Sequence, residues 1–183
     1  MKKLFNILAA ALLVLPLLWG CSEKDNLFPN SYKKVFAFKD NSTINLSMNT
    51  TQDAVVDSLL ILRGGGDPAS ASTLHMRVMT KAEACEKWGY SENDIEVIPE
   101  NSFKFVNGAD LSLGKDDAYA YTVVSFNPEA IYEAMQSNTK ATYVLPLELT
   151  SSTDTINSDL SQVLFTLNVQ RPMLQWGSGS DDL

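Results

Sequence analysis

The sequence predicts an all-β protein, either a sandwich or a barrel, with two short helices between its strands. From residue 33 onward, short runs rich in Val, Phe, Tyr, Thr and Leu are separated by Gly, Pro, Asn, Asp and Ser. Several runs alternate apolar and polar residues, which is the pattern of a strand with one buried face. Only two stretches carry helix-start signals instead.

The predicted strands cover residues 33–38, 43–48, 55–62, 74–79, 95–98, 103–106, 119–126, 143–149 and 163–169. The run 55–62 is nearly continuously apolar, so we expect both of its faces to be covered. Residues 143–149 place alternate large apolar side chains on one face. Pro146 points the other way and lacks a ladder donor, which predicts an edge strand or a bulge.

The two helices are predicted from their capping residues. Thr80-Lys81-Ala82-Glu83 has the spacing of a capping box, and Gly89 stands where a helix of about two turns would end. Asn127-Pro128-Glu129 combines an N-cap residue, a proline at the first helical position and an acid in the first turn.

The N-terminus has the composition of a secretory signal. Two lysines precede an apolar stretch that is shorter than the roughly 20 residues of a spanning helix. Leu18-Trp19-Gly20-Cys21 resembles a bacterial lipobox, although small residues are commoner than Trp at the third position from its end. The resemblance implies cleavage after residue 20 and a lipid on the Cys21 thiol, with several chains making the anchoring stable. The alternative is an uncleaved membrane anchor.

Residues 21–31 are expected to form a polar, acidic tether. The Ser22-Glu23-Lys24-Asp25 segment is similar to the surface-export signal of Bacteroidetes lipoproteins, which implies a location on the outer membrane, exposed at the cell surface. The alternative interpretation of this segment is a plain solvated linker.

Charge and cysteine content exclude several classes of protein. The 183 residues include 14 basic and 22 acidic residues and one histidine, for a net charge of −8. This balance argues against a nucleic-acid partner, which would need clustered Lys and Arg. With Cys21 used by lipid, Cys85 has no partner for an intramolecular disulfide and is expected to be a small buried apolar residue.

Four segments together carry a family resemblance. They are Val35–Phe38 (VFAF), residues 97–103 (VIPENSF), 142–151 (TYVLPLELTS) and 164–169 (LFTLNV). Over residues 32–172 the chain resembles the DUF1735 family of Bacteroidetes surface lipoproteins. The resemblance implies an immunoglobulin-like antiparallel β-sandwich, in a module that often precedes a glycan-handling domain. It supplies no catalytic motif. Residues 173–183 are expected to be a flexible tail.

No catalytic residue is predicted. Acidic residues are numerous but stand in no recognisable signature, and Asp116-Asp117 after Gly114 has the chemistry of a solvated turn. The single histidine, His75, has no nucleophile elbow to serve and is expected to be a polar residue on a strand face. The glycine-rich segment 63–67 lacks the lysine of a phosphate-binding loop and is expected to be a mobile hairpin loop.

No metal site is predicted either, because no calcium-loop motif is present. The alternative is a calcium ion held by loop carboxylates, drawn from Asp110, Asp116 and Asp117 or from Asp154 and Asp159. The only expected non-protein group is therefore the covalent lipid on Cys21.

Aromatic rings offer the remaining route to ligand binding. The candidates are Trp88, Tyr90, Tyr119, Tyr121, Tyr132 and Trp176. Trp88 and Tyr90 flank Gly89 at a helix end, and Trp176 lies in a Gly/Ser/Asp tail, so we predict these three as ligand-binding residues. The alternative for each ring is packing against the edge of the core.

The leading hypothesis is a non-enzymatic, lipid-anchored surface module for glycan binding or adhesion. Its possible partners are the membrane, through the lipid, and a polysaccharide. A second hypothesis is a structural or assembly protein that binds another surface protein by strand addition at the 143–149 edge. An enzyme is the third and least favoured hypothesis.

Overall fold

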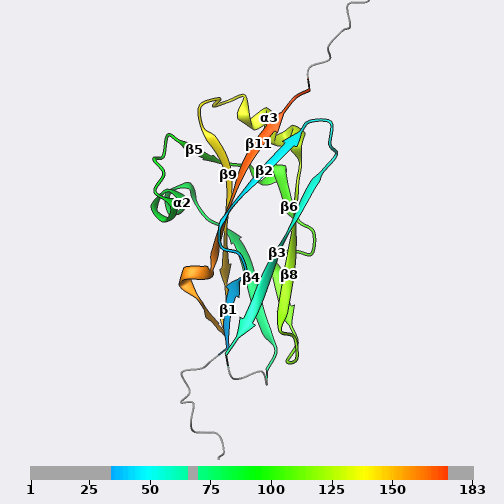
Figure 1. The fold of residues 1–183 in the computed structure, drawn as a ribbon, viewed down its shortest axis with the longest axis vertical. Helices are drawn as coiled ribbons and strands as arrows, with labels where there is room; N and C mark the ends of the chain where they lie inside the picture. Colours follow the sequence, from blue (N-terminus) through cyan, green and yellow to red (C-terminus); the bar gives the residue numbers. More distant parts are fainter. Residues whose placement is uncertain (1–33, 66–69, 173–183) are drawn as a thin grey trace, which may run out of the picture. The chain divides into compact units, whose positions relative to one another are not determined.

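The structure is a computed structural model that describes residues 34–65 and 70–172. The predicted signal peptide, the tether with Cys21, the centre of the glycine-rich loop and the tail with Trp176 lie outside these residues. Over the described ranges the chain forms two packed β-sheets and two α-helices (Figure 1).

Each sheet combines strands that are distant in sequence. Sheet A has the order β10-β1-β3-β8-β6, and these strands span Thr155–Ile156, Val35–Phe38, Val55–Gly64, Tyr119–Phe126 and Phe103–Phe105. Sheet B has the order β2-β11-β9-β4-β7, with strands spanning Thr43–Asn49, Gln162–Gln170, Thr142–Thr150, Ser72–Val78 and Asp110–Leu113. A further strand, β5 (Ile95–Val97), pairs with β9.

The strand order confirms the expected sandwich. We assigned immunoglobulin strand letters in chain order. The sheet order β1-β3-β8-β6 then corresponds to the A-B-E-D sheet of immunoglobulin domains, and β4-β9-β11 corresponds to the C-F-G sheet. The sandwich is not purely antiparallel, however, because β2 joins β11, β10 joins β1 and β5 joins β9 in parallel. The chain crosses from sheet A to sheet B between β1 and β2, which leaves β2 at an edge of sheet B.

The core lies between the sheets and is filled by alternate residues of each strand. From sheet B the inward side chains are, as predicted, Tyr143, Leu145, Leu147 and Leu149 of β9 and Val163, Phe165, Leu167 and Val169 of β11. From sheet A, Phe126 meets Phe165 edge to face with ring centroids 5.3 Å apart. These buried rings and aliphatic chains hold the two sheets together.

Both helices begin at their predicted caps. At α2 (Lys81–Trp88), the Thr80 hydroxyl accepts the N–H of Glu83 at 3.3 Å, and the Glu83 carboxylate accepts the N–H of Thr80 at 2.7 Å. Gly89 ends this helix with a φ of 73°, which glycine adopts without strain. At α3 (Pro128–Met135), Asn127 Oδ1 accepts the N–H of Ala130 at 3.2 Å. Short 3₁₀ turns span Glu100–Ser102 and Ser158–Leu160.

The prediction that Pro146 stands on an edge strand was wrong. Its strand, β9, is central, with β11 on one side and both β4 and β5 on the other. Pro146 lies between Val144, where pairing with β5 ends, and Leu147, where pairing with β4 begins. Its carbonyl accepts the N–H of Met79 just beyond β4. The missing donor therefore faces a break between two neighbours, and the expected free edge for strand addition does not exist there.

The prediction for residues 55–62 was also wrong. Leu59 and Ile61 are buried, but Val56 is 62% exposed and Leu62 is 41% exposed. Nothing among the described residues covers the outer side of β3 at these positions, so the apolar run has one buried face only.

Candidate functional site

Sheet A carries apolar side chains on its outer surface. Among the described residues, the large hydrophobic side chains that are exposed are Val56, Leu62, Val106, Tyr119 and Tyr121. All five lie on β3, on β8 or directly after β6, on the side away from the core. Together with Leu60 and Val123 they form what we name the open face. A contiguous exposed apolar patch of this kind is a candidate interaction site.

Strand register explains why these residues adjoin. Leu62 lies opposite Tyr119, and Leu60 lies opposite Tyr121, across the β3–β8 pair. Beside them, the N–H of Val106 donates to the carbonyl of Val123 at 2.8 Å, which brings Val106 alongside β8. Outward residues of neighbouring strands share one face, so the patch is continuous across three strands.

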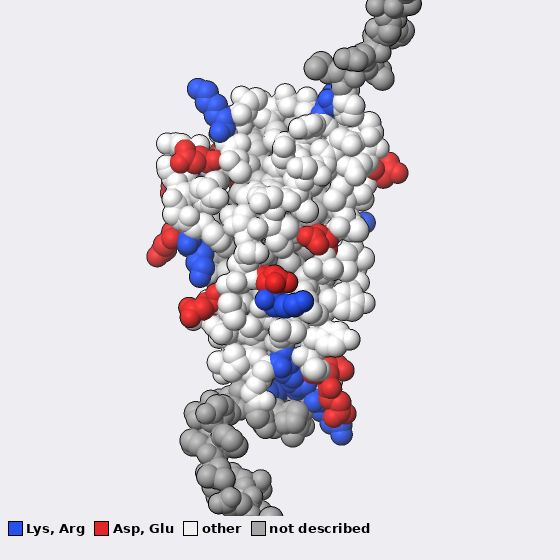
Figure 2. Space-filling model, viewed as in Figure 1, with Lys and Arg blue, Asp and Glu red and all other residues white. Residues whose placement is uncertain are grey.

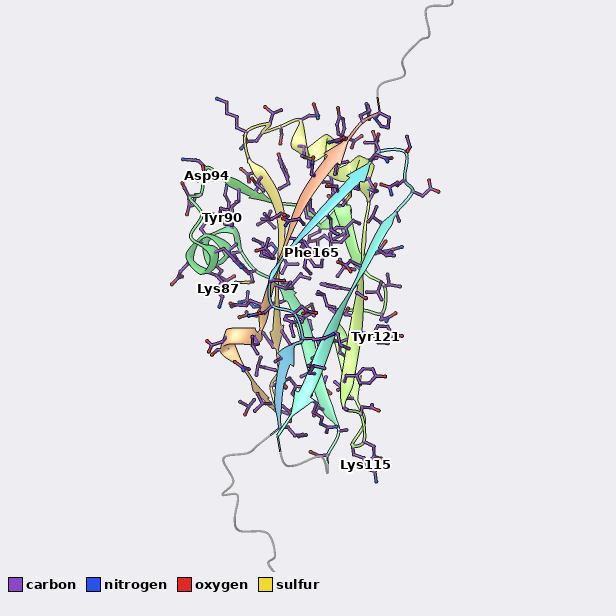
Figure 3. All side chains as sticks on the ribbon, viewed as in Figure 1. Lys87, Tyr90, Asp94, Lys115, Tyr121 and Phe165 are labelled. Carbon is purple, nitrogen blue, oxygen red and sulfur yellow. The ribbon has the colours of Figure 1, made fainter. Side chains whose placement is uncertain are left out.

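Tyr119 and Tyr121 are the most prominent members of the open face. They are 61% and 56% exposed and stand two residues apart on β8. A strand rises about 3.3 Å per residue, so the rings start about 6.6 Å apart on the same side. Figure 3 shows Tyr121 on the sheet A side of the sandwich, whereas Tyr90 lies on the opposite side near α2.

A groove of about 540 Å³ lies beside the two tyrosines. Its other lining residues include the polar side chains of Asn107, Ser112 and Asp116. It therefore combines two aromatic surfaces with hydrogen-bonding groups, which makes it a candidate site for a polar ligand.

The turn that forms one wall of this groove is held by Arg63. The Arg63 guanidinium donates to the carbonyls of Gly114, Lys115 and Asp117 at 2.8, 3.0 and 2.9 Å. Within the turn, the Asp117 carboxylate accepts the N–H of Gly114 at 2.7 Å. The predicted turn chemistry of residues 116 and 117 is confirmed, and the turn holds Asp116 at the groove.

The predicted ligand residues Trp88 and Tyr90 are half-buried and lie elsewhere. With Cys85 they pack against a cluster of Ala84, Ile95, Val144 and Leu164, each 0% exposed. Val144 and Leu164 point outward from sheet B, so α2 and the segment after it cover that sheet. Cys85 packs there as a small apolar residue, but it is half-buried and not buried as expected.

Ion pairs fasten α2 to sheet B. Arg77 of β4 donates to both carboxylate oxygens of Glu83 at 3.0 and 2.9 Å and also pairs with Glu148 of β9. The hydrogen bond from Arg77, followed by those from Thr80, lowers the pKa of Glu83 from 4.5 to about 2. The same bond to Glu83 raises the pKa of Arg77. Glu83 thus both caps the helix and anchors it.

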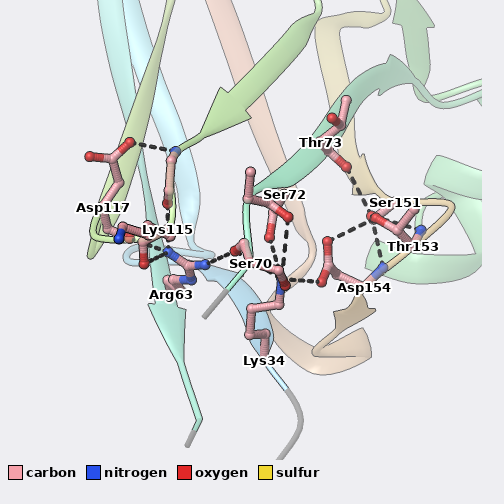
Figure 4. Close-up of polar contacts among 12 residues, drawn as sticks. Lys34, Arg63, Ser70, Ser72, Thr73, Lys115, Asp117, Ser151, Thr153 and Asp154 are labelled. Atoms are coloured by element: carbon pink, nitrogen blue, oxygen red, sulfur yellow. Dashed lines mark hydrogen bonds and ion pairs between the residues drawn. The ribbon is translucent and has the colours of Figure 1, made fainter. Parts of the chain in front are cut away.

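A second ion pair closes one end of the sandwich (Figure 4). Lys34 Nζ lies 3.0 Å from Asp154 Oδ1 and donates to the hydroxyls of Ser70 and Ser72 at 2.7 and 3.0 Å. Burial would raise the pKa of Asp154, but the hydrogen bonds from Lys34, Thr153 and Ser72 outweigh it and lower that pKa. This network joins the start of β1 to two loops and gives the Lys34 ammonium group several acceptors among the described residues.

The remaining acids and the histidine of the described residues form no larger cluster. His75 is exposed on β4, as predicted, and its Nδ1 lies 2.7 Å from Asp110 Oδ1 on β7. Within residues 34–65 and 70–172, no three His, Cys, Asp or Glu side chains gather as metal ligands. Of the calcium candidates, Asp110 and Asp154 have these other partners. No helix in the same ranges is long and apolar enough to cross a membrane.

Sequence reasoning did not single out Tyr119 and Tyr121 from the other rings. The available signal was the Tyr-Ala-Tyr spacing, which puts both rings on one face of a strand. That spacing does not say whether the face is covered, which depends on where α2 packs in three dimensions.

No family model matches the chain, and a comparison with curated proteins finds no relative. Solved structures with a similar fold include proteins from Bacteroides. A proposed carbohydrate-binding protein from Bacteroides ovatus has a TM-score of 0.56 and 18% identity, over 73% of this chain and 36% of that one. A second protein from Bacteroides ovatus, of unknown function, has a TM-score of 0.57 and 12% identity, over 78% and 47%.

A multidomain protein from Bacteroides ovatus that includes DUF1735 has a TM-score of 0.44 and 16% identity, over 76% of this chain and 44% of that one. The chain thus spans less than half the length of each of these structures. The two structures with TM-scores of 0.56 and 0.57 show the fold of the described residues and nothing further. Membership of the DUF1735 family stays a prediction from the sequence motifs.

Proposed function

We propose that this chain is a non-catalytic carbohydrate-binding module held at a bacterial cell surface by a lipid, where it serves glycan capture or adhesion. The binding part rests on one observation: two exposed tyrosines stand side by side on β8 next to a groove with polar walls. The anchoring part rests on the lipobox-like sequence that ends at Cys21.

The chemistry of the groove suits a sugar. The C–H face of a pyranose ring stacks on an aromatic ring, and its hydroxyls need both donors and acceptors. Tyr119 and Tyr121 supply the rings, while Asn107, Ser112 and Asp116 supply hydrogen-bonding groups within the same groove. A pair of rings two residues apart can contact successive parts of an extended glycan.

The acids of the groove favour binding over hydrolysis. Asp116 and Asp117 are consecutive residues of one turn, and the Asp117 carboxylate already accepts a main-chain N–H. Glycoside hydrolysis needs two carboxyl groups that flank the scissile bond. Two side chains on a single wall do not provide that arrangement.

The family resemblance points the same way. The DUF1735-like motifs and the fold shared with a proposed carbohydrate-binding protein from Bacteroides ovatus support a role at the surface of such a bacterium. The acidic segment after Cys21 supports exposure on the outer membrane.

Affinity gel electrophoresis against a panel of host and plant polysaccharides, together with a glycan array, tests the binding proposal. We expect retention by at least one polysaccharide, and we expect Tyr121→Ala to weaken it about tenfold and Tyr119→Ala to add to the loss. Val56→Ser, on the open face but outside the groove, is the matched control and should bind like the native chain. Retention that survives both tyrosine changes, or no retention at all, would contradict the proposal.

Metabolic labelling tests the anchor separately. Labelled palmitate should enter the native protein and not the Cys21→Ser variant, which should leave the membrane fraction because the lipid is its anchor. Mass spectrometry that finds residues 1–20 still attached would contradict cleavage and favour the uncleaved form.

A further inference from the structure

β2 is the longest edge strand in the described part of the sandwich, and it carries no charge. The edge strands β10, β6 and β7 have two, three and four residues, whereas β2 has seven, Thr43–Asn49. Its sequence, TINLSMN, contains no Lys, Arg, Asp, Glu or Pro. The surface over β2 is correspondingly white in Figure 2. Charges and proline are the usual protections of an exposed edge.

One side of β2 has main-chain groups with no partner strand among the described residues. The N–H of Thr50, just after β2, donates to Gln170 of β11, so even-numbered residues direct their N–H and C=O toward β11. Because these groups alternate along a strand, Thr43, Asn45, Ser47 and Asn49 direct theirs to the free edge. The N–H of Asn49 is taken by Gln52 Oε1 at 2.8 Å, which agrees with this direction.

The side chains of β2 are only partly covered by the rest of the sandwich. Ile44, Leu46 and Met48 face the core, but Ile44 and Leu46 are only half-buried because the sheet ends at β2. Thr43, Asn45 and Ser47 are exposed on the outer side. A strand added here would need apolar residues on its inner side and uncharged polar residues on its outer side.

The polar and apolar pattern of β2 is symmetric about Leu46. When two copies of β2 pair antiparallel with Leu46 opposite Leu46, Ile44 meets Met48, Asn45 meets Ser47 and Thr43 meets Asn49. Apolar residues then face apolar residues, and polar residues face polar ones, in all seven positions. The Asn45–Ser47 pairs are those whose free main-chain groups point at each other, so they form the hydrogen-bonded pairs.

We propose that this chain forms a symmetric dimer in which the β2 edges of two copies pair antiparallel about Leu46. The two B sheets then become one continuous sheet, and the interface is the same patch on both copies, as two-fold symmetry requires. The absence of charge on β2 lets two acidic chains, each of net charge −8, meet without like charges at the contact.

Analytical ultracentrifugation over a range of concentrations tests this dimer. The protein is the chain from Ser22 onward, which retains every described residue. The native chain should dimerise. The double variant Asn45→Lys with Ser47→Lys places lysine opposite lysine and should raise the dissociation constant about tenfold or more. The double variant Asn45→Lys with Ser47→Glu places lysine opposite glutamate and should keep the dimer.

A matched control adds two lysines one strand in from the edge, by Asn168→Lys with Gln170→Lys on exposed positions of β11, which do not face the second copy, and should still dimerise. Circular dichroism melting confirms that each variant folds. A native chain that stays monomeric, a dimer that tolerates both lysines at 45 and 47, or a Lys–Glu variant as weak as the Lys–Lys one would overturn the proposal.

A cross-link gives a second test that does not depend on charge. The residue on the two-fold axis is a non-hydrogen-bonded pair with Cα atoms about 4.5 Å apart, within disulfide range. In a Cys85→Ala background, Leu46→Cys should form a covalent dimer on air oxidation, whereas Thr43→Cys should not, because two copies of residue 43 lie at opposite ends of the pair. Equal cross-linking at both positions would exclude the register.

Discussion

The outward apolar side chains of the two sheets differ in how far they are exposed. On sheet B, Val144 and Leu164 point outward, yet both are 0% exposed because Trp88, Tyr90 and Ile95 pack over them. On sheet A, the outward residues Val56, Tyr119 and Tyr121 are each more than half exposed. An apolar residue on an outer face is therefore structural on one sheet and available to a ligand on the other.

The difference follows from the single insertion of α2 and β5 between β4 and β6. This segment returns over sheet B, where the Arg77–Glu83 ion pair and the β5–β9 pairing hold it in place. Sheet A receives no comparable segment among the described residues. The sequence offers two candidate rings over sheet B, Trp88 and Tyr90, and two on sheet A, Tyr119 and Tyr121. Only the packing of α2 and β5 distinguishes the half-buried pair from the exposed pair.

The largest expected effect is the difference in stability lost when a leucine is truncated on the covered face and on the open face. Leu164→Ala removes a side chain that is 0% exposed and should lower the free energy of unfolding by about 3 kcal/mol. Leu62→Ala removes one that is 41% exposed and should cost less than about 1 kcal/mol. Urea denaturation of both variants measures the difference. Equal losses would mean that the two faces are buried alike in solution.

The attachment of α2 gives a pH-dependent test of the cover. The pKa of Glu83 is lowered from 4.5 to about 2 by its bonds to Arg77 and Thr80. Because the folded-state pKa lies below that of the unfolded chain, ionised Glu83 stabilises the fold above pH 4.5, and this stabilisation is lost as the pH falls toward 2. Glu83→Gln should therefore destabilise the protein at pH 7 and flatten the fall in stability between pH 4.5 and 2.

Thermal unfolding followed at several pH values measures this change. Glu86→Gln is the matched control, since Glu86 is exposed on the same helix and has no ion pair within the described ranges. A Glu83 variant with the native pH profile would show that the ion pair does not hold the cover in place.

Local signals in the sequence predicted the local structure well. The caps of both helices, the β8 strand over residues 119–126 and the inward alternation of β9 and β11 depend on residues close in the chain. The role of Pro146 was missed because it depends on where two other strands end. The sequence analysis placed Trp88 ahead of Tyr119 as a ligand residue without knowing which outer face is covered, since burial on an outer face depends on distant packing.

A smaller contrast of the same kind lies within β8 itself. Tyr121 holds its hydroxyl on the exposed side of sheet A, whereas the next residue, Thr122, is 0% exposed and turns inward. The Thr122 hydroxyl is among the buried side-chain groups that have no hydrogen-bond partner within residues 34–65 and 70–172. A buried polar atom without a partner loses its bonds to water and gains none in return.

Thr122→Val should therefore stabilise the protein, because valine has nearly the same shape and no hydroxyl to desolvate. We expect a gain of about 1 kcal/mol in the free energy of unfolding, measured by urea denaturation. Thr122→Ser keeps the hydroxyl and removes the methyl group, so it should lose about 1 kcal/mol instead. The opposite signs separate the two contributions of one side chain. A valine variant less stable than the native chain would show that the Thr122 hydroxyl has a hydrogen-bond partner in solution. That partner could be a water molecule buried beneath the open face.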